Sequence, residues 1–297
     1  MTTLSYASLG ASLYVPATHQ KLPAILTEGI GNARSVIVCT EDAVGDRDVA
    51  HAVNHLVRSF TSAPEHTPFK RFIRPRNPFV LSQLIASSDL MSRLDGIVIP
   101  KFDGDSFDHW QKVLSSVPEL NVMPTLETAP LFREQGTLEA LDAVRQLVNP
   151  VCAVRIGAND LLGLLGIKRQ SGQTIYDTPL RSTIERIVTL FRCEGLDLSA
   201  PVCDLLEEPE TLIREVRQDM AWGFYAKTCV HPDQVDLVER LYRETLIEQA
   251  SLARSLDQRD DAVFRSEGQM MEKTCHGPWA RRVRQLGQSL AMYKEQG

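Results

Sequence analysis

The amino-acid sequence predicts an α/β fold, a (β/α)8 TIM barrel followed by a C-terminal helical extension. Eight short runs rich in β-branched residues occur along the chain, and most precede an amphipathic stretch long enough for a helix. Successive runs mostly begin about 25 residues apart, the size of one βα unit in a barrel of about 250 residues. Polar residues end nearly every run. An open, doubly wound sheet is the alternative fold, because it uses the same alternation of strands and helices.

The eight expected strands are short and end in polar or turn residues, which is typical of strands buried in a parallel sheet. In chain order they are "ASLYVPA" (11–17), "SVIVCTED" (35–42), "KRFIRPRN" (70–77), "DGIVIPK" (95–101), "NVMPTLET" (121–128), "VCAVRIGAND" (151–160), "APVCDLL" (200–206) and "GFYAKTCVH" (223–231).

Amphipathic helices are expected between these strands. The segment 181–195 predicts one helix that stops at Gly195. The gap between the sixth and seventh strands is wider, and its segment 161–181 holds scattered Gly, Ser and Asp, so we expect a loop insertion over one end of the barrel. The segment 137–148 predicts another helix, with one apolar face formed by Leu138, Leu141, Val144, Leu147 and Val148.

The sequence predicts a barrel domain, residues 1–245, and a C-terminal helical arm, residues 246–297. The polar sequence "DQRDD" at 257–261 predicts a hinge within the arm. A helical arm of this length suits packing on a neighbouring subunit, so we expect a homo-oligomer, a trimer or a higher multiple. A solvated tail helix is the alternative.

Composition excludes several classes of protein. Hydrophobic residues make up 43% and charged residues 24% of the 297 residues, as in ordinary globular proteins. The net charge of −6 gives no basic surface for nucleic acid, and no apolar run approaches a membrane span. Six cysteines without a C-x-x-C pair, and no secretory pattern at the N-terminus, predict a reduced, cytoplasmic protein. A cysteine–histidine nucleophile remains an alternative.

Charged residues gather at the ends of the expected strands. The carboxyl ends of barrel strands converge on one mouth, where active sites are built. Glu127 would therefore share a pocket with another acid, several bases and a metal rather than stand as an isolated buried charge. A single charge such as Asp42 or Asp204 could instead cap the next helix. The residues are Glu41, Asp42, Arg74, Arg76, Lys101, Glu127, Asp160, Asp204, Lys227 and His231.

Seven motifs at these strand ends resemble, in order, those of a known family. They are "SLYVPA", "VIVCTEDAV", "FIRPRNP", "DGIVIPK", "PTLETA", "RIGANDLLGLLG" and "GFYAKTCVHPDQV". The chain is similar to the citrate lyase β-subunit-like branch of the HpcH/HpaI aldolase superfamily, whose members are metal-dependent carbon–carbon bond lyases on TIM barrels.

The resemblance implies a metal and a substrate. It places Mg²⁺, with Mn²⁺ as the alternative, on Glu127 and Asp160, and hard oxygen ligands suit this ion. It implies a small carboxylate substrate bound by Arg74, Gly157 and Ala158.

The resemblance also implies catalytic roles. An arginine after the third strand would stabilise an enolate, and "RPRN" offers both Arg74 and Arg76. We favour Arg74, because it continues the alternation of the strand. Glu41 and Asp42 would orient the site, and Lys101 would either take part in catalysis or hold these acids in place.

Three positions depart from the family pattern. Glu272, in "SEGQMMEKTCHGPWARRV" (266–283), stands where related lyases carry a catalytic aspartate supplied to a neighbouring subunit. Ala11 replaces an arginine found in relatives that use acyl-coenzyme A, which disfavours a coenzyme A thioester. Thr40 replaces an apolar residue beside the acids.

His231 is expected to fix the turn into the last barrel helix, with general-base catalysis as the alternative.

The sequence therefore predicts a Mg²⁺-dependent carbon–carbon lyase that cleaves a small hydroxy or oxo acid, or its thioester, through a metal-stabilised enolate. One alternative is a thioesterase or synthase that uses the same site on an acyl-coenzyme A. The other is a non-catalytic barrel subunit of a larger complex.

Overall fold

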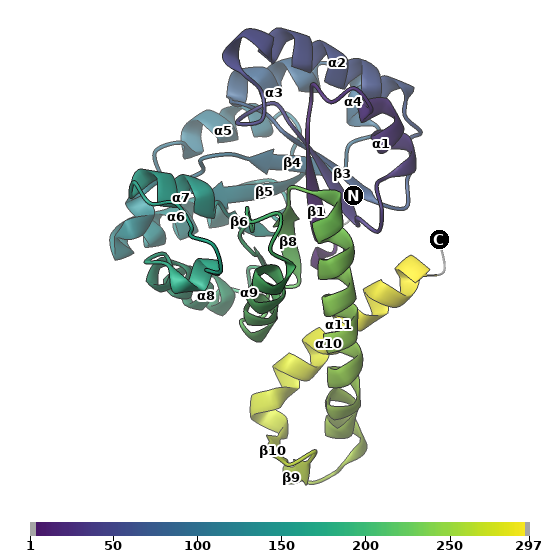
Figure 1. Cartoon of the computed structure of the whole chain (residues 1–297), viewed down its shortest axis with the longest axis vertical. Helices are drawn as coiled ribbons and strands as arrows, with labels where there is room; N and C mark the ends of the chain where they lie inside the picture. The colour runs from purple at the N-terminus through teal and green to yellow at the C-terminus, as the bar shows by residue number, and fades with distance from the viewer. Residues whose placement is uncertain (1–3, 295–297) are drawn as a thin grey trace.

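The computed structural model describes residues 4–294, and its centre is an eight-stranded parallel sheet (Figure 1). The strands pair in the order β7-β6-β5-β4-β3-β2-β1-β8, and a parallel bridge between Ala200 and Lys227 joins the β7 edge to the β8 edge. The ring is therefore closed, which confirms the predicted TIM barrel over the open sheet. The strands are β1 Gly10–Pro16, β2 Ser35–Cys39, β3 Lys70–Arg74, β4 Gly96–Ile99, β5 Asn121–Leu126, β6 Val154–Ile156, β7 Leu198–Ser199 and β8 Ala226–Cys229.

Helices surround the ring of strands (Figure 1). The α-helices are α1 Leu22–Glu28, α2 Val49–Ser62, α3 Pro78–Ile85, α4 Ser88–Met91, α5 Phe107–Leu114, α6 Glu134–Gln146, α7 Ala158–Leu164, α8 Arg181–Cys193, α9 Pro209–Ala221, α10 Pro232–Gln258 and α11 Lys273–Lys294. Short 3-10 helices are η1 Tyr6–Ser8, η2 Asp46–Asp48, η3 Ala129–Phe132 and η4 Ile175–Asp177.

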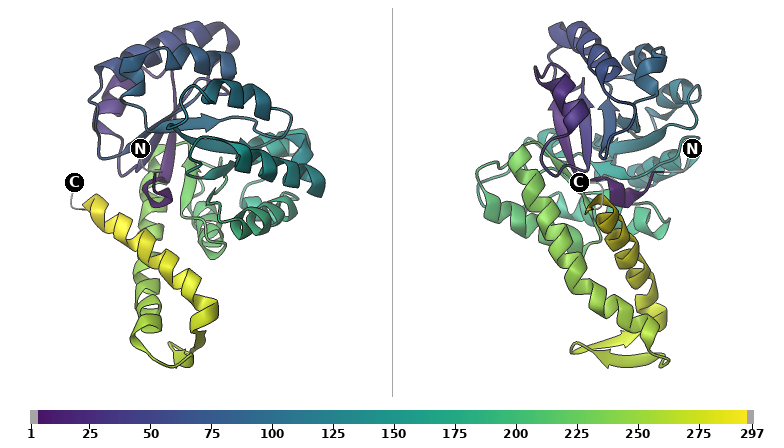
Figure 2. Two further views of the ribbon diagram at one scale, coloured as in Figure 1. Left: turned by 180° about the vertical axis from the view of Figure 1, so that it is seen from behind. Right: turned by 90° about the vertical axis from the view of Figure 1, so that its right-hand side faces the viewer.

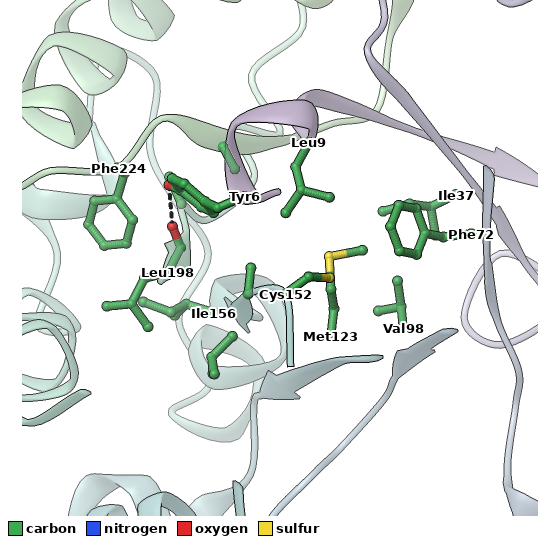
Figure 3. Close-up of a cluster of buried hydrophobic side chains, with 14 of the residues drawn as sticks. Tyr6, Leu9, Ile37, Phe72, Val98, Met123, Cys152, Ile156, Leu198 and Phe224 are labelled. Carbon is green, nitrogen blue, oxygen red and sulfur yellow. Dashed lines mark hydrogen bonds between the residues drawn. The ribbon is translucent and has the colours of Figure 1, made fainter. Parts of the chain in front are cut away.

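A cluster of buried hydrophobic side chains packs between the barrel strands and η1 (Figure 3). There the Tyr6 hydroxyl donates to the Leu198 carbonyl at 2.7 Å and accepts from the Tyr225 backbone N–H at 2.8 Å. Each large apolar side chain buried in this way contributes about 1.5–3 kcal/mol. η1 therefore lies against the N-terminal ends of β7 and β8, opposite the expected mouth. The labelled members of the cluster include Leu9, Ile37, Phe72, Val98, Met123, Cys152, Ile156 and Phe224.

The seventh and eighth strands correct two sequence-based expectations. β7 ends at Ser199 instead of spanning 200–206, because Pro201 has no N–H to extend the ladder. Lys227 does not line the mouth: its buried ammonium donates to Pro201 O at 2.7 Å, Glu215 Oε1 at 3.0 Å and Asp219 Oδ2 at 2.8 Å. Neighbouring strand residues face opposite sides, so Lys227 points outwards, toward α9.

The segment 161–181 is tied to the barrel by Arg169. Its buried guanidinium pairs with Glu215 Oε2 at 2.6 Å, donates to Val202 O at 2.8 Å and lies 3.2 Å from Asp204 Oδ1. Asp204, expected at the mouth after the seventh strand, is therefore engaged in holding this segment.

The C-terminal arm is a helical hairpin that projects from the barrel (Figure 2). α10 continues without a break across residues 245 and 246, where the sequence suggested the domain boundary, and ends at Gln258. β9 (Val263–Ser266) and β10 (Gln269–Glu272) pair antiparallel at the far end. α11 then returns along α10, with Arg284 2.7 Å from Asp257. None of the helices in residues 4–294 is long and apolar enough to cross a membrane.

Candidate active site at the barrel mouth

Six of the predicted site residues line one cavity of about 500 Å³ at the carboxyl ends of the strands. They are Asp42, Arg74, Glu127, Gly157, Ala158 and Asp160. Because these residues follow four different strands, only closure of the barrel brings them together.

Glu127 is the buried carboxylate of this cavity. Its Oε1 accepts from the Lys101 backbone N–H at 2.8 Å and from Arg74 Nη2 at 2.9 Å. Its Oε2 has no hydrogen-bond partner among the described residues. Burial raises the pKa of Glu127 to about 7, although Arg74 acts in the opposite direction. A buried carboxylate oxygen without a partner is rare and indicates a missing ligand or ion.

Gly157 makes room for this carboxylate. A Cβ atom at position 157 would lie 2.1 Å from Glu127 Oε2 and 2.6 Å from Glu127 Cβ. Both distances are too short for non-bonded atoms. The glycine after β6 is therefore needed for the carboxylate to keep its position.

Asp160 lies in the first turn of α7, where the helix N-terminus favours a negative charge. It is close enough to Glu127 to raise the pKa of that carboxyl. In the described part of the chain no group of three or more His, Cys, Asp or Glu side chains is arranged to hold a metal ion. Two carboxylates at this mouth, Glu127 and Asp160, could supply protein ligands to a cation that takes its other ligands from water or substrate, as Mg²⁺ often does.

Arg74 joins the acids on one side of the cavity. Its Nη2 lies 2.6 Å from Glu41 Oε2, 2.9 Å from Glu127 Oε1 and 3.3 Å from Asp42 Oδ2. Burial disfavours the charged form, but the neighbouring Tyr14, Glu127 and Glu41 raise the pKa of Arg74 above its ordinary value. The guanidinium therefore stays charged.

Glu41 and Asp42 respond differently to the same surroundings. Burial raises the pKa of Glu41. Burial acts on Asp42 in the same direction, but the hydrogen bond with Glu41 and the charges of Lys101 and Arg74 lower the pKa of Asp42 overall. Asp42 is thus the acid that stays ionised at lower pH.

Lys101 links the acids across the mouth. Its Nζ pairs with Glu41 and lies 3.3 Å from Asp42 Oδ1 and 3.6 Å from Asp160 Oδ1. Its φ of +49° is a left-handed conformation that costs a non-glycine residue about 1 kcal/mol or more. The Lys101 backbone N–H binds Glu127, and its ammonium lies among three other acids. Both contacts support a role for Lys101 in holding the acids in place.

Arg76 and Glu272 lie outside the cavity. The Arg76 guanidinium donates to Val44 O at 3.0 Å and pairs with Asp46, so it supports the segment after β2. Because β3 ends at Arg74, the alternation of side chains along the strand does not place Arg76 on the same face as Arg74. Glu272 belongs to β10 at the far end of the arm (Figure 2). A catalytic role for Glu272 requires a second chain and stays a prediction.

His231 is the N-cap of α10. Its side chain accepts from the Asp233 backbone N–H at 3.3 Å, and Gln234 completes a capping box. This geometry agrees with a role in the turn into the last barrel helix.

Sequence reasoning missed the polar residues deeper in the cavity. Tyr14 of β1, Thr125 of β5, Arg155 of β6 and Thr228 of β8 all line it. The only signal was an arginine inside the otherwise apolar run "VCAVRIGA".

A closed barrel whose strand ends gather acids and an arginine around one cavity defines an enzyme of the TIM-barrel class. Residues 3–291 match the family model described as C–C bond lyase of the TIM-barrel fold, and the chain belongs to that family. The predicted resemblance to citrate lyase β-like proteins is confirmed.

Named relatives and solved structures are similar over most of the chain. A citrate lyase subunit beta-like protein of Deinococcus radiodurans is 29% identical and aligns over 90% of this chain and 93% of its own length. A (3S)-malyl-CoA thioesterase of Cereibacter sphaeroides is 24% identical, over 77% of this chain and 75% of its own. The crystal structure of CitE from Mycobacterium tuberculosis with magnesium, acetoacetate and coenzyme A has a TM-score of 0.72 at 21% identity, covering 95% of this chain and 99% of that one.

Proposed function

We propose that this protein is a Mg²⁺-dependent carbon–carbon lyase that cleaves a small hydroxy or oxo acid and leaves an enolate. The observation that carries the proposal is Glu127 Oε2, a buried carboxylate oxygen without a partner among residues 4–294, beside Asp160 in a cavity that also holds Arg74. The relatives named as citrate lyase β-like proteins, and the magnesium in the CitE structure, are consistent with it.

Glu127 and Asp160 would hold the ion. Their oxygens match the hard ligands that Mg²⁺ prefers, and two carboxylates leave coordination positions for a substrate carboxylate and its adjacent oxygen. When bound, the ion supplies electrostatic stabilisation of negative charge on the substrate oxygens.

Arg74 would stabilise the enolate from the protein side. Cleavage of the Cα–Cβ bond leaves its electron pair on one fragment as an enolate. The β-hydroxyl gives its proton to solvent, and its oxygen becomes the carbonyl oxygen of the other fragment. Arg74 Nε is buried and has no partner among the described residues, so a donor remains for a substrate oxygen. The facing Glu41 and Glu127 hold the guanidinium in one position, which lowers the cost of reorganisation during the reaction.

A thioesterase acting on an acyl-coenzyme A is the second candidate, and the Cereibacter relative named as a malyl-CoA thioesterase favours it. Against it, position 11 holds a fully buried alanine and offers no cation. Product analysis separates the two, because a lyase releases two carbon fragments and a thioesterase releases an intact acid.

Metal binding tests the proposal. We expect Mg²⁺ to bind the wild-type chain in isothermal titration calorimetry, and Glu127→Gln and Asp160→Asn to weaken binding at least about tenfold, since each removes one of two anionic ligands. Asp108→Asn is the matched control, because Asp108 is an exposed acid in the first turn of α5. Wild-type affinity in folded Glu127→Gln and Asp160→Asn variants would contradict the assignment.

A further inference from the structure

Arg155 is a buried arginine inside the barrel without a carboxylate partner. Arg155 is 2% exposed, and it lines the same cavity as Glu127 and Asp160. Its Nη2 donates to Thr228 Oγ1, its Nη1 lies 3.9 Å from Met123 Sδ, and its guanidinium carbon lies 5.3 Å from the centre of the Tyr14 ring. Within residues 4–294 it forms no ion pair. A buried charge that is not paired costs several kcal/mol.

The other buried arginines have strong acceptors. Arg71 donates to the carbonyls of Pro64 and Glu65 at 2.7 Å each. Arg34 binds Glu239, Arg169 binds Glu215, and Arg74 binds three acids. The contacts of Arg155 are a hydroxyl, a thioether and an aromatic face, which are all uncharged. It is therefore the buried arginine whose surroundings call for an anion from outside the chain.

A second buried donor lies beside Arg155. The β5–β6 register places Thr125 opposite Arg155, so both side chains face the barrel interior. Thr125 is 2% exposed and lines the cavity, and its Oγ1 has no hydrogen-bond partner among the described residues. A buried hydroxyl without a partner in the chain is free to bond a water or a ligand atom.

We infer that Arg155 and Thr125 form a second anion-binding subsite in the cavity, which takes a carboxylate at the other end of the substrate from the Glu127–Asp160 pair. The inference rests on the proposed function and narrows its substrate to dicarboxylic oxo or hydroxy acids. The planar guanidinium matches a carboxylate in two parallel hydrogen bonds, and the Thr125 hydroxyl adds a third donor. A monocarboxylic acid would leave the Arg155 charge buried and unpaired.

Matched pairs of acids test the inference. Oxaloacetate is compared with 2-oxobutyrate, and 2-oxoglutarate with 2-oxopentanoate, by calorimetry with saturating Mg²⁺. In the wild-type chain we expect at least one diacid to bind about tenfold or more tighter than its monoacid, because charged hydrogen-bond partners are left unpaired by the monoacid. In Arg155→Met the ratio should fall to about one, because the variant has no cation left to pair with a second carboxylate.

Further variants keep the test sharp if Arg155→Met does not fold. Arg155→Lys retains the charge but not the two-pronged geometry, and should give an intermediate ratio. Thr125→Val removes only a hydroxyl that bonds nothing in the described chain, and should lower the ratio a few-fold. Arg181→Met, at an exposed arginine paired with Glu185 outside the cavity, is the control.

Separate readouts distinguish this inference from the proposed function. Titration with Mg²⁺ alone tests the metal site, and absence of binding would overturn the proposed function. Binding of a carboxylate by Arg155 is tested without metal, by the rise in melting temperature that succinate and glutarate cause. This rise should be larger in the wild type than in Arg155→Met. Equal diacid and monoacid affinities in a wild type that binds Mg²⁺ would overturn the subsite. Inorganic phosphate that binds more tightly than every diacid would overturn its assignment to a carboxylate.

Discussion

Close contact between Gly157 and Glu127 shows how single residues determine the site. The carboxylate occupies space that any side chain at position 157 would fill. Glu127 Oε2 can therefore keep its position only because residue 157 has no Cβ.

Gly157→Ala should displace the Glu127 carboxylate, since the new Cβ would lie 2.1 Å from Oε2. We expect Mg²⁺ affinity to fall about tenfold or more, and stability to fall by about 1–3 kcal/mol from overpacking. Calorimetry and chemical denaturation measure the two effects. Gly163→Ala, in α7 where a Cβ would meet nothing within 4 Å, is the matched control and should be neutral or slightly stabilising.

Magnesium affinity should depend on pH through Glu127. Burial raises the pKa of this carboxyl to about 7, and the ion binds only the ionised form. Below pH 7 the ion must displace a proton, so the apparent affinity should fall by up to about tenfold per pH unit, and above pH 7 it should level off. Titrations at pH 6, 7 and 8 check this. Equal affinity at pH 6 and pH 8 would argue against Glu127 as a ligand.

At the scale of elements, a buried ion cluster fastens β8 to α9. Lys227 donates to Glu215 and Asp219, and all three side chains are fully buried. The Tyr176 hydroxyl also donates to Asp219, which brings in η4. The cluster lies outside the barrel, and its residues do not line the cavity.

Lys227→Met should destabilise the fold by about 3–5 kcal/mol, because it leaves two acids buried without their cation. Burial already raises the pKa of Asp219 from 3.8 to about 6 with Lys227 present. An acid whose pKa is raised on folding binds more protons in the folded state, so its effect lowers stability as pH rises through that window. At pH 5 the buried acids take up protons more readily, so the loss of stability caused by Lys227→Met should be smaller at pH 5 than at pH 8. Urea denaturation at both pH values measures it, and a loss that does not change with pH would contradict the account.

At the scale of the whole molecule, the arm carries Glu272 away from its own cavity. α10 and α11 place β10 at the end that points away from the barrel (Figure 1). Arg282, near the middle of α11, ties this helix to the barrel, since its guanidinium binds Asp197 at 2.6 Å and donates to Gly223 O at 3.1 Å. If Glu272 acts in the reaction, it acts on the cavity of another copy of the chain.

Mixing two inactive variants tests this arrangement. Glu127→Gln removes a cavity acid, and Glu272→Gln removes the arm acid. We expect each variant alone to have little activity, and co-expressed chains to exceed the sum of the two, because some mixed oligomers contain one intact site formed by two subunits. Full activity of Glu272→Gln alone would remove Glu272 from the mechanism.

The sequence alone determined the strand order, the closed barrel and the meeting of Glu127 with Asp160 at the mouth. Barrel topology brings the carboxyl ends of all strands together, so residues that follow strands meet wherever the strands end. Whether a strand side chain points into the barrel or outwards was decided only by the tertiary structure. Lys227 faces α9 and its neighbour Thr228 faces the cavity, because register and the partners on each face decide which side is inward. Arg155 faces the cavity for the same reason, whereas Arg76 lies outside it because β3 ends at Arg74.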